Sequence, residues 1–241
     1  MNGEYKHSTL NNQFSISKEG SLLKSSCKFF KVYFTCALSV EYSFEKHFYL
    51  FLPYNLSLTT FQMPFLETPR LILREWKNSD SPIFIEMNRD ERVMEFFPSL
   101  LTEEESLAMI VRIKKLLAEN NFGLWAVERK DTNEFIGFVG LSIPRFQTDF
   151  TPCVEIGWRL AHKHWGYGFA TEAAAACLDY GFNVLKLNEI VSFTSVLNIK
   201  SMNVMKKIGM NYVKDFEHLN IEDGNRLKRH VLYRKLANSE L

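Results

Sequence analysis

The stretch HWGYGFATEAAAACLDYGF, residues 164–182, places a loop with two glycines directly before a helix of small residues. It follows a strand-like segment at Val154–Leu160. A helix rich in alanine packs closely on a sheet, so this order predicts an α/β fold. Gly166 and Gly168 carry no Cβ, and the free N–H groups and positive dipole at a helix start favour an anion. The stretch therefore predicts an anion-binding loop between a strand and a helix.

Two common nucleotide-binding loops are excluded by the residues themselves. A Walker loop needs Gly-Lys-Ser/Thr after its second glycine, and here Gly168 is followed by Phe169-Ala170. A dinucleotide fingerprint needs a third glycine, and Thr171 occupies that place. Thr171 is expected to cap the helix, with Glu172 suited to its first turn. A tight turn that holds no ligand stays open as the alternative.

Strands and helices follow one another along the chain after residue 62. Thr102 and Glu105 form a capping box before a helix whose apolar residues recur at helical spacing. Gly209 ends a later helix, where a left-handed residue is favoured. We expect strands at 70–76, 122–128, 135–141, 154–160, 189–195, 212–214 and 230–235, and helices at 79–87, 103–120, 169–182 and 198–208. Adjacent strands mixed with crossover helices predict a mixed sheet.

Composition changes at Met63. Every arginine and all four tryptophans lie after residue 62, and the segment before it shows no strand or helix period. We expect residues 1–62 to be an N-terminal extension, poorly ordered or a mis-assigned start, and residues 63–241 to form the domain. A lobe that packs on the domain through its aromatic residues is the alternative. Charged residues interrupt the apolar stretch 29–61, so no membrane segment is expected.

Charge and cysteine content limit the partners. The 29 Lys and Arg residues nearly balance the 28 Asp and Glu residues, for a net charge of +1. That balance predicts neither a nucleic acid nor a membrane surface as partner. The four cysteines form no C-x-x-C pair. We therefore expect no disulfide framework, no metal site and a cytoplasmic location.

Three stretches after Met63 resemble the GNAT N-acetyltransferase superfamily: ETPRLILREW (67–76), VEIGWRLAHKHWGYGFATEA (154–173) and NIKSMNVMKKIGM (198–210). The loop in the second is similar to the superfamily's pyrophosphate loop, Gln/Arg-x-x-Gly-x-Gly/Ala, with Trp165 where Gln or Arg is commonest. The flanking stretches resemble the branch that acetylates N-terminal residues of ribosomal proteins. The resemblance implies a GNAT fold, a mixed central sheet with a splay between two parallel strands, flanked by helices.

The resemblance also implies that acetyl-coenzyme A (acetyl-CoA) lies where strands 154–160 and 189–195 splay apart. The pantetheine arm would pair with free backbone groups, as an added strand does. The phosphates would lie on the glycine loop, where Trp165 would act through its backbone N–H, and Lys163 is either a further phosphate contact or part of a solvated basic turn. The implied cofactor contacts are Trp158, Arg159, Leu160, Lys163, Trp165, Gly166, Tyr167, Gly168, Phe169, Ala170, Thr171 and Asn198.

Catalytic roles follow from the same resemblance. Members of the branch carry a glutamate at the position of Glu155, which implies a general base that deprotonates the amine. A solvated or ion-paired glutamate is the alternative. Asn198 either caps its helix or bonds the pantetheine amides, or does both. The tyrosine that protonates the leaving thiolate in many members is absent from the third stretch, which leaves Ser201 or a water for that step.

These features predict an acetyl-CoA-dependent N-acetyltransferase that acts on a primary amine by direct attack on the thioester. The acceptor is expected to be a protein N-terminus, that of a ribosomal protein among the options, or a small amine. Its site would be built from 79–98 and 218–230. The alternative is a non-catalytic acyl-CoA-binding or sensing module. The sequence is compatible with either a monomer or a homodimer.

Overall fold

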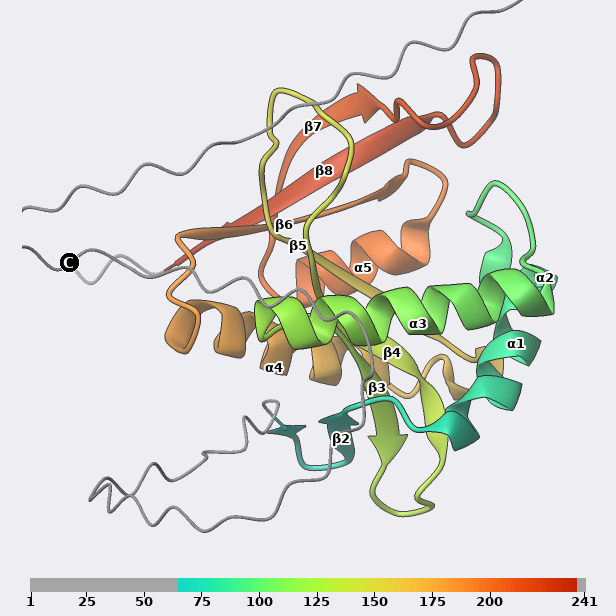
Figure 1. The fold of residues 1–241 in the computed structure, drawn as a ribbon. Helices are drawn as coiled ribbons and strands as arrows, with labels where there is room; N and C mark the ends of the chain where they lie inside the picture. The colour runs from blue at the N-terminus through green and yellow to red at the C-terminus, as the bar shows by residue number, and fades with distance from the viewer. Residues whose placement is uncertain (1–64, 238–241) are drawn as a thin grey trace, which may run out of the picture. The chain divides into compact units, whose positions relative to one another are not determined.

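The computed structural model describes residues 65–237, which build a twisted sheet with helices on both faces (Figure 1). The sheet has eight strands in the order β1-β2-β3-β4-β5-β6-β8-β7. The strands are β1 (Leu66–Glu67), β2 (Leu71–Arg74), β3 (Leu124–Arg129), β4 (Phe135–Ser142), β5 (Glu155–Leu160), β6 (Glu189–Ser195), β7 (Asn211–Glu217) and β8 (Arg229–Leu236). The helices are α1 (Ser81–Arg89), α2 (Glu91–Met94), α3 (Glu103–Asn120), α4 (Phe169–Asn183) and α5 (Ile199–Lys207), with short 3-10 turns η1 (Asn78–Asp80) and η2 (His162–His164).

The local signals in the sequence set several of these boundaries. The Thr102 side chain accepts from Glu105 N–H, and the Glu105 carboxylate accepts from Thr102 N–H, so the predicted capping box begins α3. Asn198 Oδ1 accepts from Ser201 N–H at 3.1 Å and caps α5. Gly209 follows α5 with φ +78°, the left-handed conformation that glycine adopts freely.

Strand β5 pairs over very different lengths with its two neighbouring strands. It pairs antiparallel with β4 along its whole length, from Glu155↔Ser142 to Leu160↔Gly137. Its parallel pairing with β6 consists of a single register pair, Glu155↔Val191. The two strands therefore diverge after the start of β5, which confirms the predicted mixed sheet with a splay between parallel strands. We call the region beside residues 157–160, where β5 no longer pairs with β6, the β5–β6 gap.

Alternate residues of β5 point to opposite faces of the sheet. Trp158 Nε1 donates to Ser201 Oγ on α5 at 3.1 Å, so the even-numbered residues face α4 and α5. Arg159 Nη1 donates to Asn88 Oδ1 on α1 at 2.7 Å, so the odd-numbered residues face α1. The core fills both faces, and its largest fully buried side chains include Trp125, Phe84, Leu71, Leu73, Ile136, Leu141, Ile156 and Ile190.

Some features differ from the sequence-based expectations. Strand β1 and helix α2 were not expected, and β7 is longer than the predicted 212–214, with a register shift after Tyr212. Gly168, with no side-chain cap, is the N-cap of α4, so the prediction that Thr171 caps this helix is wrong. The boundary predicted at Met63 and the apolar stretch 29–61 lie outside the described residues. Among residues 65–237, every helix is too short or too polar to cross a bilayer.

Candidate active site

The glycine loop has the geometry of an anion cradle. Gly166 and Gly168 have φ of +85° and +81°, and a Cβ on Gly166 would meet no atom within 4 Å. The first backbone bond of α4 runs from Glu172 N–H to Gly168 O at 3.0 Å. The N–H groups of Phe169, Ala170 and Thr171 therefore have no partner inside the helix and mark its positive end. This end of α4 is suited to bind a phosphate.

Arg70 and Glu172 hold the loop against the first strands. Glu172 accepts hydrogen bonds from Arg70 Nε at 2.6 Å, from Arg70 N–H at 2.9 Å and from Thr68 Oγ1 at 2.6 Å. Arg70 Nη1 also donates to the Tyr167 carbonyl at 3.0 Å. These bonds lower the pKa of Glu172 against the opposing effect of burial. Sequence reasoning assigned no role to Arg70, because its partner lies 102 residues away.

Phe169, the first residue of α4, packs into the core. Its ring is buried, with 5% of its surface exposed, and the guanidinium groups of Arg70 and Arg129 lie 4.6 and 5.2 Å from its centroid. Tyr167, by contrast, is exposed and stacks on Phe169 with ring centroids 5.9 Å apart. Two arginines therefore border the loop that sequence reasoning identified.

Trp165 contributes to the site through its indole. Its Nε1 donates to the Leu160 carbonyl at 2.8 Å, and the Lys200 Nζ lies 4.6 Å from the ring centroid. Its backbone N–H, which was expected to bind phosphate, donates instead to His162 O at 3.0 Å and closes η2. The Trp165 indole thus covers the end of β5, and the Trp165 backbone N–H already has a partner, so it is not free to bind a phosphate.

The β5–β6 gap exposes one set of backbone groups. Val191 N–H bonds Val154 O at 2.9 Å, so the even-numbered residues of β5 direct their N–H and C=O groups toward β6. Trp158 and Leu160 continue this alternation where β6 has diverged. The backbone of Arg159 is directed to β4, where it pairs with Phe138. Of these three predicted contacts, Arg159 therefore offers no backbone group to the gap, and its side chain bonds Asn88 on α1.

Glu155 lies at the point where the β5–β6 gap begins, since it is the β5 residue that pairs with Val191. Its carboxylate accepts only a long contact, 3.5 Å, from Ser142 Oγ. Burial raises the pKa of Glu155 from 4.5 to about 8, and the Ser142 contact opposes this only weakly. No cation pairs with the carboxylate among the described residues. Glu155 is half-buried, so its role as general base and the alternative of a solvated glutamate both stay predictions.

Ser201 and Asn198 lie on the α5 side of the same gap. The Ser201 hydroxyl accepts the indole N–H of Trp158, which leaves its own hydrogen free to donate. Asn198 caps α5 with its Oδ1, and its Nδ2 donates to Thr194 Oγ1 at 3.1 Å. The Trp158 side chain thus links β5 to α5 beside the gap.

The basic turn before the loop is paired with an acid. Lys163 Nζ binds the Glu134 carboxylate, and the His164 Nε2 lies 3.5 Å from the same carboxylate. Burial lowers the pKa of His164. Residues 65–237 contain no group of three His, Cys, Asp or Glu side chains arranged to hold a metal.

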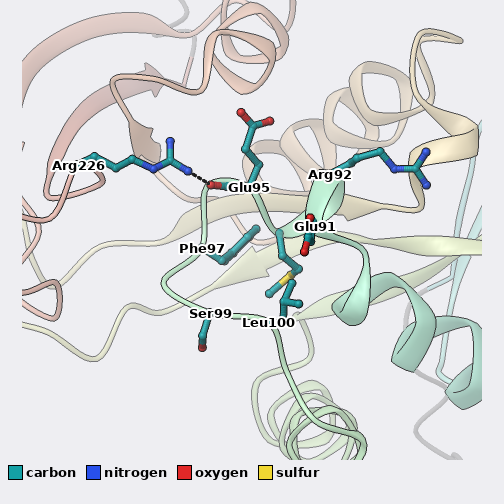
Figure 2. Close-up of a pocket in the computed structure, with 8 residues that line it drawn as sticks. Glu91, Arg92, Glu95, Phe97, Ser99, Leu100 and Arg226 are labelled. Atoms are coloured by element: carbon teal, nitrogen blue, oxygen red, sulfur yellow. Dashed lines mark hydrogen bonds between the residues drawn. The ribbon is translucent and has the colours of Figure 1, made fainter.

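A hollow of about 490 Å³ lies between the α2 segment and the β7–β8 loop (Figure 2). Arg226 from that loop donates to the Glu95 carbonyl at 2.9 Å across it. Its lining is formed by Glu91, Arg92, Met94, Glu95, Phe97, Ser99, Leu100 and Arg226. Most of this lining falls in the two segments, 79–98 and 218–230, that were expected to build the acceptor site.

Comparison with known proteins identifies the family. Residues 70–211 match the family described as "Acetyltransferase (GNAT) domain". The uncharacterized N-acetyltransferase YnaD of Bacillus subtilis is 34% identical over 146 residues, which is 60% of this chain and 81% of that protein. An acetyltransferase of the GNAT family from Bacillus anthracis has a similar structure, with a TM-score of 0.62 and 27% identity over 73% of this chain and all of the other.

Two more distant structures share the fold. The ribosomal-protein-S5-alanine acetyltransferase of Vibrio fischeri has a TM-score of 0.59 and 19% identity, covering 73% of this chain and 98% of that one. The spermidine N-acetyltransferase of Vibrio cholerae, solved with CoA and spermine, has a TM-score of 0.57 and 21% identity, covering 70% and 97%. The loop, the diverging strands and the sequence match agree, and the protein belongs to the GNAT family of acetyltransferases.

Proposed function

We propose that this protein transfers the acetyl group of acetyl-CoA to a primary amine by direct attack of the amine on the thioester. The observation that carries the proposal is the position of Glu155. It is a carboxyl group without a cationic partner at the start of the β5–β6 gap, with a pKa raised to about 8. A base is most effective when its pKa lies near the working pH.

The described residues supply each part of the reaction. The glycine loop and the start of α4 hold the phosphates, and Trp158 N–H polarises the thioester carbonyl as negative charge develops on its oxygen. Glu155 accepts a proton from the attacking amine, whose nitrogen forms a bond to the carbonyl carbon. The carbon–sulfur bond then breaks, and the thiolate takes a proton from the Ser201 hydroxyl or from a water bonded to it. Solvent accepts the proton held by Glu155 and replaces the one lost by Ser201 or the water. The products are the amide and CoA.

The acceptor we favour is the N-terminal amine of a protein or a small amine. Support comes from the fold shared with a ribosomal-protein alanine acetyltransferase and a spermidine acetyltransferase. The stretch ETPRLILREW (67–76) resembles the branch that acetylates N-terminal residues of ribosomal proteins, and this resemblance supports the same choice. We also propose that residues 63–241 form the acetyltransferase domain and that residues 1–62 are an appendage to it.

The test is release of free CoA from acetyl-CoA in the presence of a panel of amines, compared between wild type and Glu155→Gln. An acyltransferase releases CoA only with an acceptor and slows strongly in the variant. A module that only binds acyl-CoA gives calorimetric binding without CoA release for every amine in the panel, and that result would exclude the proposed reaction.

A further inference from the structure

Arg159 is a buried arginine that the reaction above does not use. Its side chain leaves β5 on the same face as Glu155, and only 8% of its surface is exposed. Among residues 65–237, no carboxylate lies within ion-pair distance of its guanidinium. Burial lowers the pKa of Arg159 to about 10. A buried charge without a counter-ion is costly and calls for an explanation.

A second buried arginine shows how this fold normally satisfies such a group. Arg74, 4% exposed, donates from both Nη atoms to Asp80 at 2.8 Å and from Nε to Glu128 at 2.7 Å. All three guanidinium nitrogens of Arg74 therefore donate to a carboxylate. Arg159 is also buried, but among the described residues no carboxylate pairs with it.

The contacts of Arg159 leave one edge of its guanidinium free. Nη1 donates to Asn88 Oδ1 at 2.7 Å, and Nε is buried without any partner. The rings of Phe97 and Phe138 lie 4.0 and 5.5 Å from the guanidinium carbon. Nε and Nη2 make no hydrogen bond to the described residues, so a ligand that pairs with Arg159 binds at this edge. That edge is the fork that binds a carboxylate through two parallel hydrogen bonds.

The orientation of the fork is set by a buried chain of hydrogen bonds. Asn88 Nδ2 donates to Ser106 Oγ at 3.0 Å, and Ser106 Oγ donates to Thr102 O at 2.8 Å. Asn88 and Ser106 are fully buried. This chain fixes the Asn88 amide with its oxygen toward Arg159. The guanidinium is therefore held in place before any ligand arrives.

Open space separates Arg159 from Glu155 on this face of β5. The residue between them on the face is Gly157, where a Cβ would meet no atom within 4 Å. Four residues of extended strand span about 13 Å between the Cα atoms of Glu155 and Arg159. Phe97, which covers the guanidinium, also lines the hollow of Figure 2. The face of β5 between the base and the unpaired fork is therefore open at Gly157, and the ring that covers the guanidinium reaches the hollow.

We infer that Arg159 binds a carboxylate of the acceptor, so that the substrate class is an amine that also carries a carboxylate group. The inference rests on the proposed function for the role of Glu155. The acceptor amine stands at Glu155, and its carboxylate accepts hydrogen bonds from Arg159 Nε and Nη2. The ligand supplies the counter-ion that the chain lacks, and the same contact selects acceptors over their neutral analogues.

The experiment compares matched acceptors in wild type, Arg159→Met and Arg159→Lys. Glycine, alanine, β-alanine and γ-aminobutyrate are each assayed beside their own carboxamide by CoA release. We expect wild type to prefer at least one acid over its amide by roughly a hundredfold in kcat/KM, the scale of a buried charge-assisted pair. Arg159→Met loses this preference while activity toward the amides persists, and Arg159→Lys retains part of it because the charge stays and the fork is lost.

Stability and binding measurements separate this role from a structural one. Arg159→Met leaves the Asn88 oxygen without its donor but no carboxylate without its cation, so its Tm falls less than that of Arg74→Met, which removes three charge-assisted bonds to Asp80 and Glu128. Butyrate, but not butyramide, raises the Tm of wild type and not of Arg159→Met. This readout needs no turnover, so it holds even if no amine is acetylated. Equal acid and amide rates in wild type, together with no shift from butyrate, would overturn the inference, as would a preference that survives in Arg159→Met.

Discussion

Glu155 keeps its proton at neutral pH in the free protein, because burial raises its pKa to about 8. The unfolded chain loses that proton near pH 4.5, so between these two values the folded state binds more protons than the unfolded state. The free energy of unfolding contributed by this group therefore falls as pH rises from about 4.5 to about 8. Glu155→Gln removes this loss, since the amide does not ionise.

We expect Glu155→Gln to be more stable than wild type at pH 8 and equal to it near pH 4.5, as measured by the Tm of both proteins across this range. The acetylation rate of Glu155→Gln falls by roughly a hundredfold or more at neutral pH. The wild-type rate rises through pH 8 as Glu155 loses its proton, and the rate of the variant does not show this rise. Glu189→Gln, a carboxylate on the neighbouring strand paired with Arg234 at 3.5 Å, is the control and keeps the wild-type profile. A Glu155→Gln enzyme with a normal rate would remove this residue from the mechanism.

Gly168 offers a second test at the residue scale. Its φ of +81° strains any other residue, and a valine Cβ would lie 3.6 Å from Arg70 Nη2, at the loop where we expect the phosphate to bind. Gly224, with φ +80° and open space around it, is a matched control in the β7–β8 loop. We expect Gly168→Val and Gly224→Val to lose similar stability, about 1–3 kcal/mol, while only Gly168→Val abolishes acetyl-CoA binding in calorimetry. Equal affinities in the two variants would refute the phosphate cradle.

Single-residue roles were predictable where the signal was local. The glycines of the loop and the Asn198 cap could be identified from neighbouring sequence. The indole bond of Trp165 to Leu160 O and the unpaired edge of Arg159 could not, because each depends on where the chain folds back. For Glu155 the position came from resemblance, but the direction of its pKa shift required the buried surroundings that only the fold creates.

At the scale of elements, the bonds of Glu172 to Thr68 and Arg70 join α4 to the turn between β1 and β2. We expect Glu172→Ala to lower stability by about 1–2 kcal/mol and to weaken acetyl-CoA binding, because the loop loses its fixed position. Glu103, in the first turn of α3, pairs with Arg89 at 3.4 Å with both side chains exposed. Glu103→Ala removes a similar charge from a helix start and is expected to change stability only slightly and affinity not at all. Chemical denaturation and titration with acetyl-CoA measure both effects, and equal behaviour of the two variants would contradict the anchoring role.

Element boundaries were predicted best where capping or periodicity is strong. The α3 capping box appears as expected, and the bounds of β3, β4, β5 and β6 lie within two residues of the expected ones. The two-residue β1 and the four-residue α2 are too short to show a period and form through pairing with β2 and through the Asp90 cap. The register shift in β7 hid its length, because a bulge breaks the alternation of side chains.

At the scale of the whole molecule, the divergence of β5 from β6 organises the site. It presents the backbone of Trp158, the carboxyl of Glu155 and the α5 residue Ser201 around one gap, while the glycine loop lies at the end of β5. The order of strands and helices in the sequence was sufficient to predict the mixed sheet. The divergence itself came from family resemblance, since no residue pattern encodes where two strands stop pairing.

The domain boundary gives the last prediction. The family match, residues 70–211, and all eight strands lie after Met63. A chain that begins at Met63 therefore keeps the whole sheet, and we expect it to fold cooperatively and to bind acetyl-CoA with the affinity of the full chain. The measurements are thermal melting and calorimetric titration of both proteins.

A chain that begins at Glu75 is the control for this cut. It lacks β1 and β2, including Leu71 and Leu73, which are fully buried and contribute about 1.5–3 kcal/mol each, and it lacks the Arg70 anchor of the loop. It is expected to aggregate or to melt without a cooperative transition. If the chain from Met63 behaves like this control while the full chain folds, the first 62 residues belong to the domain, and the boundary at Met63 is wrong.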